Sequence, residues 1–248
     1  MNRAATRGTW AEAGRRLLVK AVEEFAYEEL LTPRQDEAAG VDDAYRLDLS
    51  DGVHWTFRAA RGTFGTWRLA GPPVRHPAPA DADADADGDG EAGPERFLLD
   101  ARGVLGWDGP TTAEVLRELT ATRRADAASL ARALPAARLA DLDHLDLEAH
   151  QDGHPCMLLN KGRLGFSAAD AAAYAPETAD AVHLVWAAVH TGLAAYSGVP
   201  GLDADTLLKE ELDDDVRERF TGVLETACAY GPYAADDFVW LPVHPFHW

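Results

Sequence analysis

The sequence predicts an α+β fold, in which an N-terminal helix packs on an antiparallel β-meander and a mainly helical region follows. Three observations support this class: an amphipathic run near the N-terminus, three short strand candidates between residues 44 and 69, and helical patterns in most of the remainder. Strands and helices do not alternate along the chain, so a doubly wound parallel sheet is not expected.

The N-terminal helix is predicted over Trp10–Leu31. Its apolar residues recur at the spacing of one helix face: Leu17, Leu18, Ala21, Val22, Phe25 and Leu30. Pro33 and the acidic run after it end the helix, because proline cannot continue the backbone hydrogen bonding.

Three strand candidates follow, over Ala44–Leu49, His54–Ala60 and Thr63–Leu69. Asp51-Gly52 and Arg61-Gly62 lie between them, where hairpin turns are expected. We therefore expect an antiparallel meander that packs on the first helix.

Residues 71–94 form a break, and most of it is an acidic low-complexity tract without large apolar side chains. Such a composition predicts a disordered, solvated loop. The alternating aspartates at 81–89 leave calcium binding as an alternative.

The middle of the chain is predicted to contain a short strand over Phe97–Asp100 and a helix over Thr111–Leu134. Thr111 or Thr112 is the expected N-cap of that helix. A further helix is predicted over Leu139–His150, leading into a glycine-rich motif.

The last third is predicted to begin with a short helix over Ala168–Tyr174, capped by Ser167. Two longer helices are expected over Ala181–Ser197 and Leu207–Tyr230, and a strand over Phe238–Val243. This strand would deliver His244 to a loop at its end.

The composition limits the function. The chain has 248 residues and a net charge of −19, which argues against a nucleic-acid-binding surface and against adsorption to anionic lipid. Only two cysteines are present and the N-terminus has no apolar signal segment, so a cytoplasmic location is expected. An anionic ligand can still bind where the charge is locally positive.

The stretch GHPCMLLNKGRLGFS, residues 153–167, is such a place. His154, Lys161 and Arg163 lie within ten residues of one another, interleaved with Gly153, Gly162 and Gly165. Glycine lets backbone N–H groups approach an anion, while lysine and arginine supply charge to phosphate or carboxylate. The stretch therefore predicts an anion site, with a solvated surface turn as the alternative.

Other patterns are weaker. The motif lacks the Gly-Lys-Ser/Thr ending of a phosphate-binding P-loop, so any nucleotide site needs a different architecture. Four histidines offer an alternative zinc site: His150, His154, His244 and His247. Pro245 disfavours a regular helix through the last pair, and we assign no metal ligand.

Two elements resemble a known family. His154, Pro155, Lys161, Arg163 and Gly165 match the spacing His-Pro-x-His-Pro-x-x-Lys-x-Arg-x-Gly of the IucA/IucC family, the siderophore synthetases that work without a peptide-synthetase assembly line. The C-terminal LPVHPFHW resembles that family's Pro-Val-His-Pro-Trp-Gln segment. Met157 and Leu158 occupy the place of the second His-Pro pair.

The resemblance implies an ATP-dependent ligase. Such enzymes use Mg²⁺ and ATP to activate a carboxylate of citrate, a citrate derivative or another dicarboxylic acid as an acyl-adenylate. An amine, often of a polyamine, or an alcohol then displaces AMP. Family members often form homodimers, so a homodimer is implied as well.

The resemblance also implies a division of the chain. Residues 1–146 would form a thumb-like domain, and residues 147–248 would open the fingers domain that binds the nucleotide. The implied ATP and carboxylate ligands are Gly153, His154, Lys161, Arg163, Gly165, Ser167 and His244. No catalytic residue is assigned.

Family members are considerably longer than this chain. Their Ser-x-Arg-Thr segment and magnesium-binding acids lie beyond the C-terminal element, so we expect the 248-residue chain alone to have little or no ligase activity. Two other functions stay open: a non-catalytic nucleotide- or anion-binding module, and a metal-binding protein that uses the four histidines.

Overall fold

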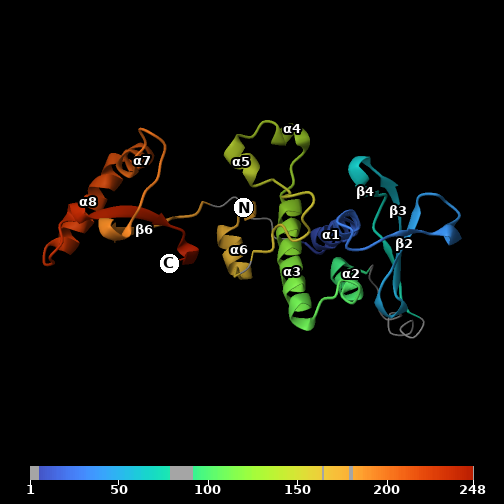
Figure 1. The fold of residues 1–248 in the computed structure, drawn as a ribbon. Coiled ribbons are helices and arrows are strands. Elements are labelled where there is room, and N and C mark those ends of the chain that lie inside the picture. Colours follow the sequence, from blue (N-terminus) through green and yellow to red (C-terminus); the bar gives the residue numbers. More distant parts are fainter. Residues whose placement is uncertain (1–5, 79–91, 164, 179–180, 248) are drawn as a thin grey trace. The chain divides into compact units, whose positions relative to one another are not determined.

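A computed structural model describes residues 6–78, 92–163, 165–178 and 181–247 (Figure 1). The chain divides into two compact units, Met1–Asp180 and Ala181–Trp248. Helices and antiparallel strands occur together in each unit, and the α+β prediction is confirmed. The boundary between these units follows Asp180 and lies downstream of the expected boundary between thumb and fingers at 146/147. The assignment of the thumb and fingers domains stays a prediction.

The first helix, α1, spans Arg7–Tyr27 and confirms the predicted N-terminal helix. Thr6 caps it in a reciprocal pair with Thr9, which satisfies N–H groups of the first turn. The chain turns out of the helix at Glu29, whose φ is +58°. Leu31 therefore packs in the core from outside the helix, whereas Leu30, which was expected on the buried helix face, is 52% exposed.

The sheet of the first unit is antiparallel throughout. In the described residues it contains β1 (Arg34–Gln35), β2 (Ala44–Asp48), β3 (His54–Arg61), β4 (Trp67–Leu69) and β5 (Val74–His76). Strands β1 to β4 follow one another in order, so the predicted meander is confirmed. Both β4 and β5 pair with β3, each with a different half of it.

Two sequence predictions near this sheet were wrong. The third strand was expected to begin at Thr63, but Thr63–Gly65 form a 3₁₀ turn with Phe64 at a φ of +60°, and pairing starts at Trp67. The predicted loop 71–94 contains the strand β5, which a three-residue segment is too short to signal by alternation. The rest of the acidic tract, 79–91, lies outside the described residues.

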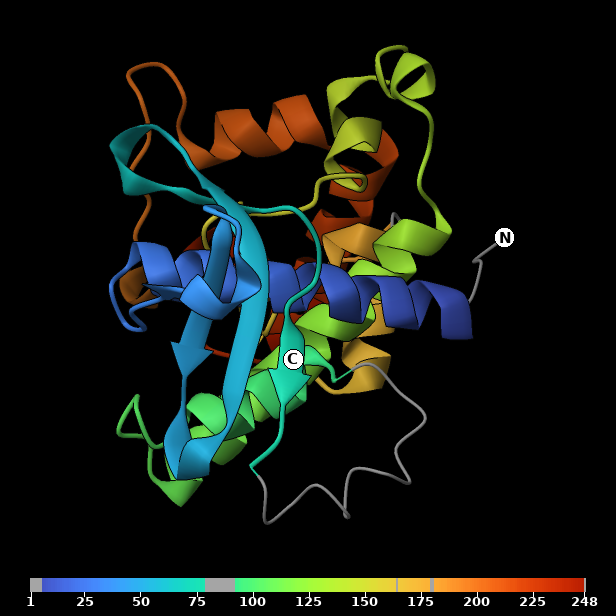
Figure 2. The same cartoon turned by 90° about the vertical axis from the view of Figure 1, so that its right-hand side faces the viewer.

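The core of the first unit lies between the sheet and the helices. Figures 1 and 2 show α1 running between the sheet and the long helix α3. Trp55 of β3 is fully buried and meets the ring of Phe97 edge-on, with 5.3 Å between ring centroids. Leu17, Val22 and Leu119 fill the space between the two helices and the sheet.

The segment predicted as a strand at Phe97–Asp100 is helical, and that prediction was wrong. It belongs to α2 (Pro94–Ala101), in which Pro94 occupies the first turn. Proline there pre-sets the helical φ. Phe97, Leu98 and Ala101 are buried on one face, a spacing that four residues alone could not reveal.

The following helix, α3, spans Gly109–Ala131 and confirms the predicted helical region. Its N-cap is Asp108, whose carboxylate accepts the backbone N–H of Thr111 at 2.8 Å, so the assignment to Thr111 or Thr112 was wrong. Of the helix predicted over Leu139–His150, only α5 (His144–Glu148) forms, and α4 (Ala136–Leu139) ends where that helix was expected to begin. Asp143 sets the start of α5, because its side chain caps that helix.

The second unit pairs β6 (Val185–His190) with β7 (Phe238–Val243) and contains α7 (Ala204–Glu211) and α8 (Asp214–Cys228). The prediction of a helix over Ala181–Ser197 was wrong, because this segment contains the strand β6. The predicted strand at Phe238–Val243 is confirmed. The long helix predicted over Leu207–Tyr230 is broken between α7 and α8.

The packing of this unit is aromatic. The ring of Phe220 on α8 lies 5.3 Å from Trp186 and 4.5 Å from Trp240, centroid to centroid, so the helix covers one side of the strand pair. Across both units, no helix in the described residues has the length and apolar content needed to cross a bilayer.

Candidate functional site

The predicted anion motif lies on a loop between α5 and α6 (Ala168–Tyr174), and α1 holds that loop in place. The Nζ of Lys20 donates to the backbone oxygen of His154 at 2.7 Å. Leu158 is 2% exposed and belongs to the hydrophobic core. Leu158, which stands in the place of the family's second His-Pro pair, therefore anchors the loop by its burial in the core.

Two charged groups of α1 lie against this loop. Burial raises the pKa of Glu24, while a hydrogen bond from the backbone of Leu158 acts in the opposite direction. Burial also lowers the pKa of Lys20. The contact between α1 and the loop thus has a cost, because both charged groups are partly removed from water.

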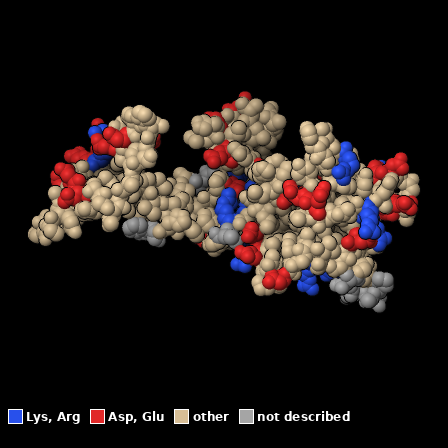
Figure 3. Space-filling model, viewed as in Figure 1, with Lys and Arg blue, Asp and Glu red and all other residues tan. Residues whose placement is uncertain are grey.

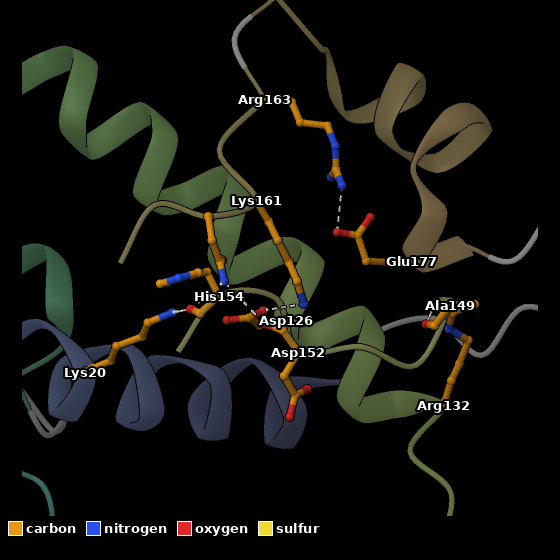
Figure 4. A network of polar contacts seen from close by, with 10 residues as sticks. Lys20, Asp126, Arg132, Ala149, Asp152, His154, Lys161, Arg163 and Glu177 are labelled. Carbon is orange, nitrogen blue, oxygen red and sulfur yellow. Dashed lines mark hydrogen bonds and ion pairs between the residues drawn. The ribbon is translucent and has the colours of Figure 1, made fainter. Parts of the chain in front are cut away.

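The cationic side chains of the motif form ion pairs with neighbouring elements (Figure 4). The Nζ of Lys161, whose side chain is 4% exposed, lies 2.9 Å from Oδ1 of Asp126 on α3. The Nη2 of Arg163 lies 2.8 Å from Oε1 of Glu177, which follows α6. Lys161 thus joins the loop to α3, and Arg163 joins it to the segment after α6.

The glycines let the loop turn and pack closely. A Cβ at Gly162 would lie 2.7 Å from the Cβ of Glu118 and 3.0 Å from its backbone oxygen, so only glycine lets the loop rest directly on α3. Gly153 and Gly165 have φ values of +80° and +86°, in the left-handed region that favours glycine. Gly162 was expected to let the backbone approach an anion, but in the described residues it approaches Glu118 of α3.

Ser167 caps α6, and this prediction is confirmed. Its hydroxyl accepts the N–H of Asp170 at 3.1 Å, and the carboxylate of Asp170 accepts the N–H of Ser167 at 2.8 Å. Hydrogen bonds to its carboxylate from the side chain and the backbone of Ser167 lower the pKa of Asp170. The cap fixes where the loop ends and α6 begins.

A cavity of about 330 Å³ lies between α3, the end of the loop and α6. Four basic residues line it: Arg124, Arg132, Lys161 and Arg163. Its remaining walls are mostly alanines of α3 and α6, together with Phe166. Figure 3 shows basic side chains at the surface between these helices, with acidic side chains on either side.

Sequence reasoning missed Arg124 and Arg132. Arg124 lies on α3, and Arg132 follows the last residue of that helix. Eight residues are just over two helical turns, so the two arginines lie on the same side. That spacing within the predicted helix was the available signal. It identifies a cavity only when the position of the glycine-rich loop is known.

The structure brings together part of the predicted ligand set. Lys161, Arg163 and Ser167 line the cavity, whereas His154, Gly153 and Gly165 are exposed and are not among the described residues that line it. The Nδ1 of His154 accepts the backbone N–H of Cys156 at 3.2 Å. The place of these three residues in a ligand site stays a prediction.

His244 belongs to the second unit, directly after β7, and is half-buried. Its Nδ1 accepts the backbone N–H of Phe246 at 3.2 Å. Its part in the site also stays a prediction. Within the ranges that the structure describes, no group of three or more His, Cys, Asp or Glu residues could hold a metal ion.

The cavity suits an anion that carries an apolar or planar body. Guanidinium groups bind phosphate and carboxylate in a bidentate manner, and the alanine walls of α3 and α6 offer apolar contact. Cavities of this size hold small molecules in many proteins. The cavity is therefore a candidate site for a small anionic molecule.

Comparison with known proteins identifies the family of this chain. Residues 143–248 match the IucA / IucC family. Over 96% of its length the chain is 34% identical to the putrebactin synthase of Shewanella sp. (strain MR-4) and 30% identical to the aerobactin synthase of Escherichia coli. The aerobactin synthetase IucC from a hypervirulent Klebsiella pneumoniae superposes with a TM-score of 0.81 at 28% identity, covering 97% of this chain and 41% of that one.

The chain belongs to the IucA / IucC family. It spans 36% of the length of the putrebactin synthase and 38% of that of the aerobactin synthase.

Proposed function

We propose that the protein containing this chain takes part in siderophore biosynthesis as an ATP-dependent ligase. It would activate a carboxylate of citrate, a citrate derivative or another dicarboxylic acid as an acyl-adenylate and join it to an amine or alcohol. Family membership and the similarity to the putrebactin and aerobactin synthases support this proposal. The structural observation that carries it is the cavity between α3 and α6, with its four basic residues.

In this proposal the cavity binds part of the ATP molecule. Arg132 and Arg163 contact phosphate oxygens, and the alanine walls contact the apolar part of the nucleotide. Positive groups that are fixed before the reaction stabilise the charge that develops when the carboxylate attacks the α-phosphorus of ATP and pyrophosphate leaves. The ion pair with Glu177 holds the guanidinium of Arg163 at the cavity, while the Asp126 pair gives Lys161 a mainly supporting role.

The residues present also fit a magnesium ion beside the nucleotide. Glu177 lines the cavity, and its Oε2 is buried without a hydrogen-bond partner in the described residues. Magnesium in nucleotide sites takes one or two carboxylates together with phosphate oxygens and water. Glu177 would supply one such carboxylate, and the ion would neutralise phosphate charge.

We further propose that the protein works in the cytoplasm and acts on small molecules. Both cysteines, Cys156 and Cys228, are free thiols, which fits a reducing compartment. A homodimer is proposed from the family resemblance.

Titration of the 248-residue chain with ATP, followed by calorimetry, tests the nucleotide site. Arg132→Gln and Arg163→Gln should each weaken binding about tenfold, because each removes a charge-assisted hydrogen bond to phosphate. Arg58→Gln removes the same charge from an exposed position on β3 and should leave the affinity unchanged. Equal affinities in all three variants, or no ATP binding by the parent chain, would refute the site.

The ligase proposal has a separate test in the longer protein that contains this chain. Release of AMP that requires citrate or another dicarboxylic acid, and a product mass that contains the acid joined to an amine or alcohol, are expected. Absence of acid-dependent AMP release over a panel of dicarboxylic and tricarboxylic acids would contradict the proposal.

A further inference from the structure

The first unit contains a second groove, of about 630 Å³, that the proposed nucleotide site does not use. It lies between α1, the segment leading into β5, and the start of α2, and it shares no lining residue with the α3–α6 cavity. Four arginines line it: Arg15, Arg75, Arg96 and Arg123. Leu18, Pro72 and Val74 form apolar parts of its wall.

Two carboxylates near the groove are each shared between two arginines. Asp100, with a side chain only 2% exposed, lies 2.7 Å from Arg75 and 2.8 Å from Arg96. On α1, Glu12 lies 2.8 Å from Arg15 and 2.9 Å from Arg16. Each of these two carboxylates thus holds two guanidinium groups in place.

Arg123 is fixed in the wall of the groove. Its guanidinium lies over the ring of Trp10, 4.4 Å from the centroid, and its Nε donates to the backbone oxygen of Trp10 at 3.2 Å. It also donates to Glu95 at 2.7 Å. A Cβ at Gly14 would lie 2.4 Å from its Nη2, so the absence of a side chain on α1 makes room for this arrangement.

Fixing a guanidinium before a ligand arrives reduces the entropy that is lost on binding. The exposed arginines complete the arrangement, because the side chain of Arg96 is 46% exposed and that of Arg15 is 43% exposed. Four guanidinium groups in one groove contrast with the net charge of −19 carried by the whole chain.

We propose that this groove binds a small polyanion, with two or more carboxylate or phosphate groups on a short apolar body. The arginines bind the anionic groups, and the leucine, proline and valine side chains contact the body between them. The site lies apart from the α3–α6 cavity and does not depend on the proposed ligase activity.

Two probes distinguish the chemistry of the ligand: tricarballylate for carboxylates and inorganic pyrophosphate for phosphates. Each is titrated into the 248-residue chain by calorimetry, and the arginine Nε–H signals are followed by ¹⁵N NMR. To remove binding at the other cavity, the titrations are repeated in the variant Arg132→Gln/Arg163→Gln. We expect at least one probe to bind in both backgrounds and to shift the signals of Arg96 and Arg123.

The double variant Arg15→Gln/Arg96→Gln should weaken this binding about 100-fold, roughly tenfold for each guanidinium lost. Its matched control is Arg46→Gln/Arg58→Gln, which removes the same charge from exposed ion pairs on β2 and β3. The control should change the affinity less than twofold. The tighter of the two probes then gives the class of anionic group.

Three outcomes would overturn the proposal. One is the absence of binding for both probes, and the second is equal weakening in the control variant. The third is loss of all binding in the Arg132→Gln/Arg163→Gln background, which would assign the polyanion to the α3–α6 cavity instead. Failure of ATP binding alone would leave the groove proposal untouched, so the two proposals fail separately.

Discussion

The Nζ of Lys161 lies 2.9 Å from Oδ1 of Asp126, and this ion pair joins the glycine-rich loop to the long helix α3. The lysine side chain is 4% exposed and the aspartate side chain 23% exposed. Burial of this degree makes each charge depend on the other, because neither is fully hydrated in the folded chain. The pair is therefore the main polar attachment of the loop to the helix.

Replacing Asp126 with Asn should lower the apparent free energy of unfolding by about 3 kcal/mol, because it leaves a buried ammonium group without a counter-charge. Urea denaturation followed by circular dichroism measures the change. The double variant Lys161→Met/Asp126→Leu should recover most of the loss, since an apolar pair does not require hydration. A double variant as unstable as Asp126→Asn would show that the cost does not come from the isolated charge.

Gly162→Ala should displace the loop from α3, because the new Cβ would lie 2.7 Å from the Cβ of Glu118. We expect a loss of about 1–3 kcal/mol, typical of overpacking, and faster hydrogen exchange in the loop. Gly71→Ala is the control, since a Cβ there meets no atom within 4 Å. Similar effects of the two substitutions would argue against close contact of the loop with the helix.

Glu24→Gln should change the pH dependence of stability. Burial raises the pKa of Glu24 in the folded state, so its stabilising contribution is complete below the unfolded value of about 4.5 and is lost as the pH rises through the folded pKa. Glutamine carries no charge at any pH and avoids this loss. The advantage of the variant over the parent chain should therefore grow as the pH rises from 4 to 7.

Urea titrations at a series of pH values measure that advantage. Glu37→Gln, in an exposed turn, removes the same charge and serves as the control. An advantage of Glu24→Gln that is constant from pH 4 to 7 would contradict the assigned direction of the pKa change.

Asp100→Ala should lower the free energy of unfolding by about 3–5 kcal/mol. It would remove the carboxylate that lies 2.7 Å from the buried guanidinium of Arg75, and it would remove the acceptor of the Trp55 indole N–H, which lies 3.1 Å from Asp100. Arg96→Gln should cost less than about 1 kcal/mol, because that side chain is half-exposed and Asp100 keeps its other partners. Thermal unfolding of both variants tests the ranking, and a reversed order would contradict it.

Local patterns predicted those elements whose signals lie within their own residues. The amphipathic face of α1, the turns between β2 and β3, and the Ser167 cap of α6 each depend on near neighbours in sequence. Register and burial then follow from alternation and spacing. These elements, with the meander that they imply, were predicted correctly.

The strand β6 shows why other elements were not predicted. Its sequence, VWAAVH, is a continuous apolar run without alternation, and length and composition favoured a helix. The decisive contact is with β7, about fifty residues later, where Val185 pairs with Val243 and His190 with Phe238. Pairing over such a distance overrides local propensity and leaves no local trace.

The sequence predicted some residues of the candidate site but not how they are brought together. Lys161 and Arg163 were found from their spacing in the motif, but their ion-pair partners Asp126 and Glu177 lie 35 and 14 residues away. Arg132 contributes to the same cavity from α3. Which cations line one cavity depends on how the loop packs on that helix, and local spacing does not report this packing.

Burial of Leu158 has a consequence for how the α3–α6 cavity can respond to a ligand. Its α3 side is rigid, because moving the loop would expose Leu158 and separate Lys161 from Asp126. The opposite side is the seven-residue helix α6, tied to the loop through the partly exposed pair of Arg163 and Glu177. A ligand larger than the cavity would therefore be accommodated by displacement of α6, with the loop and α3 acting as the fixed frame.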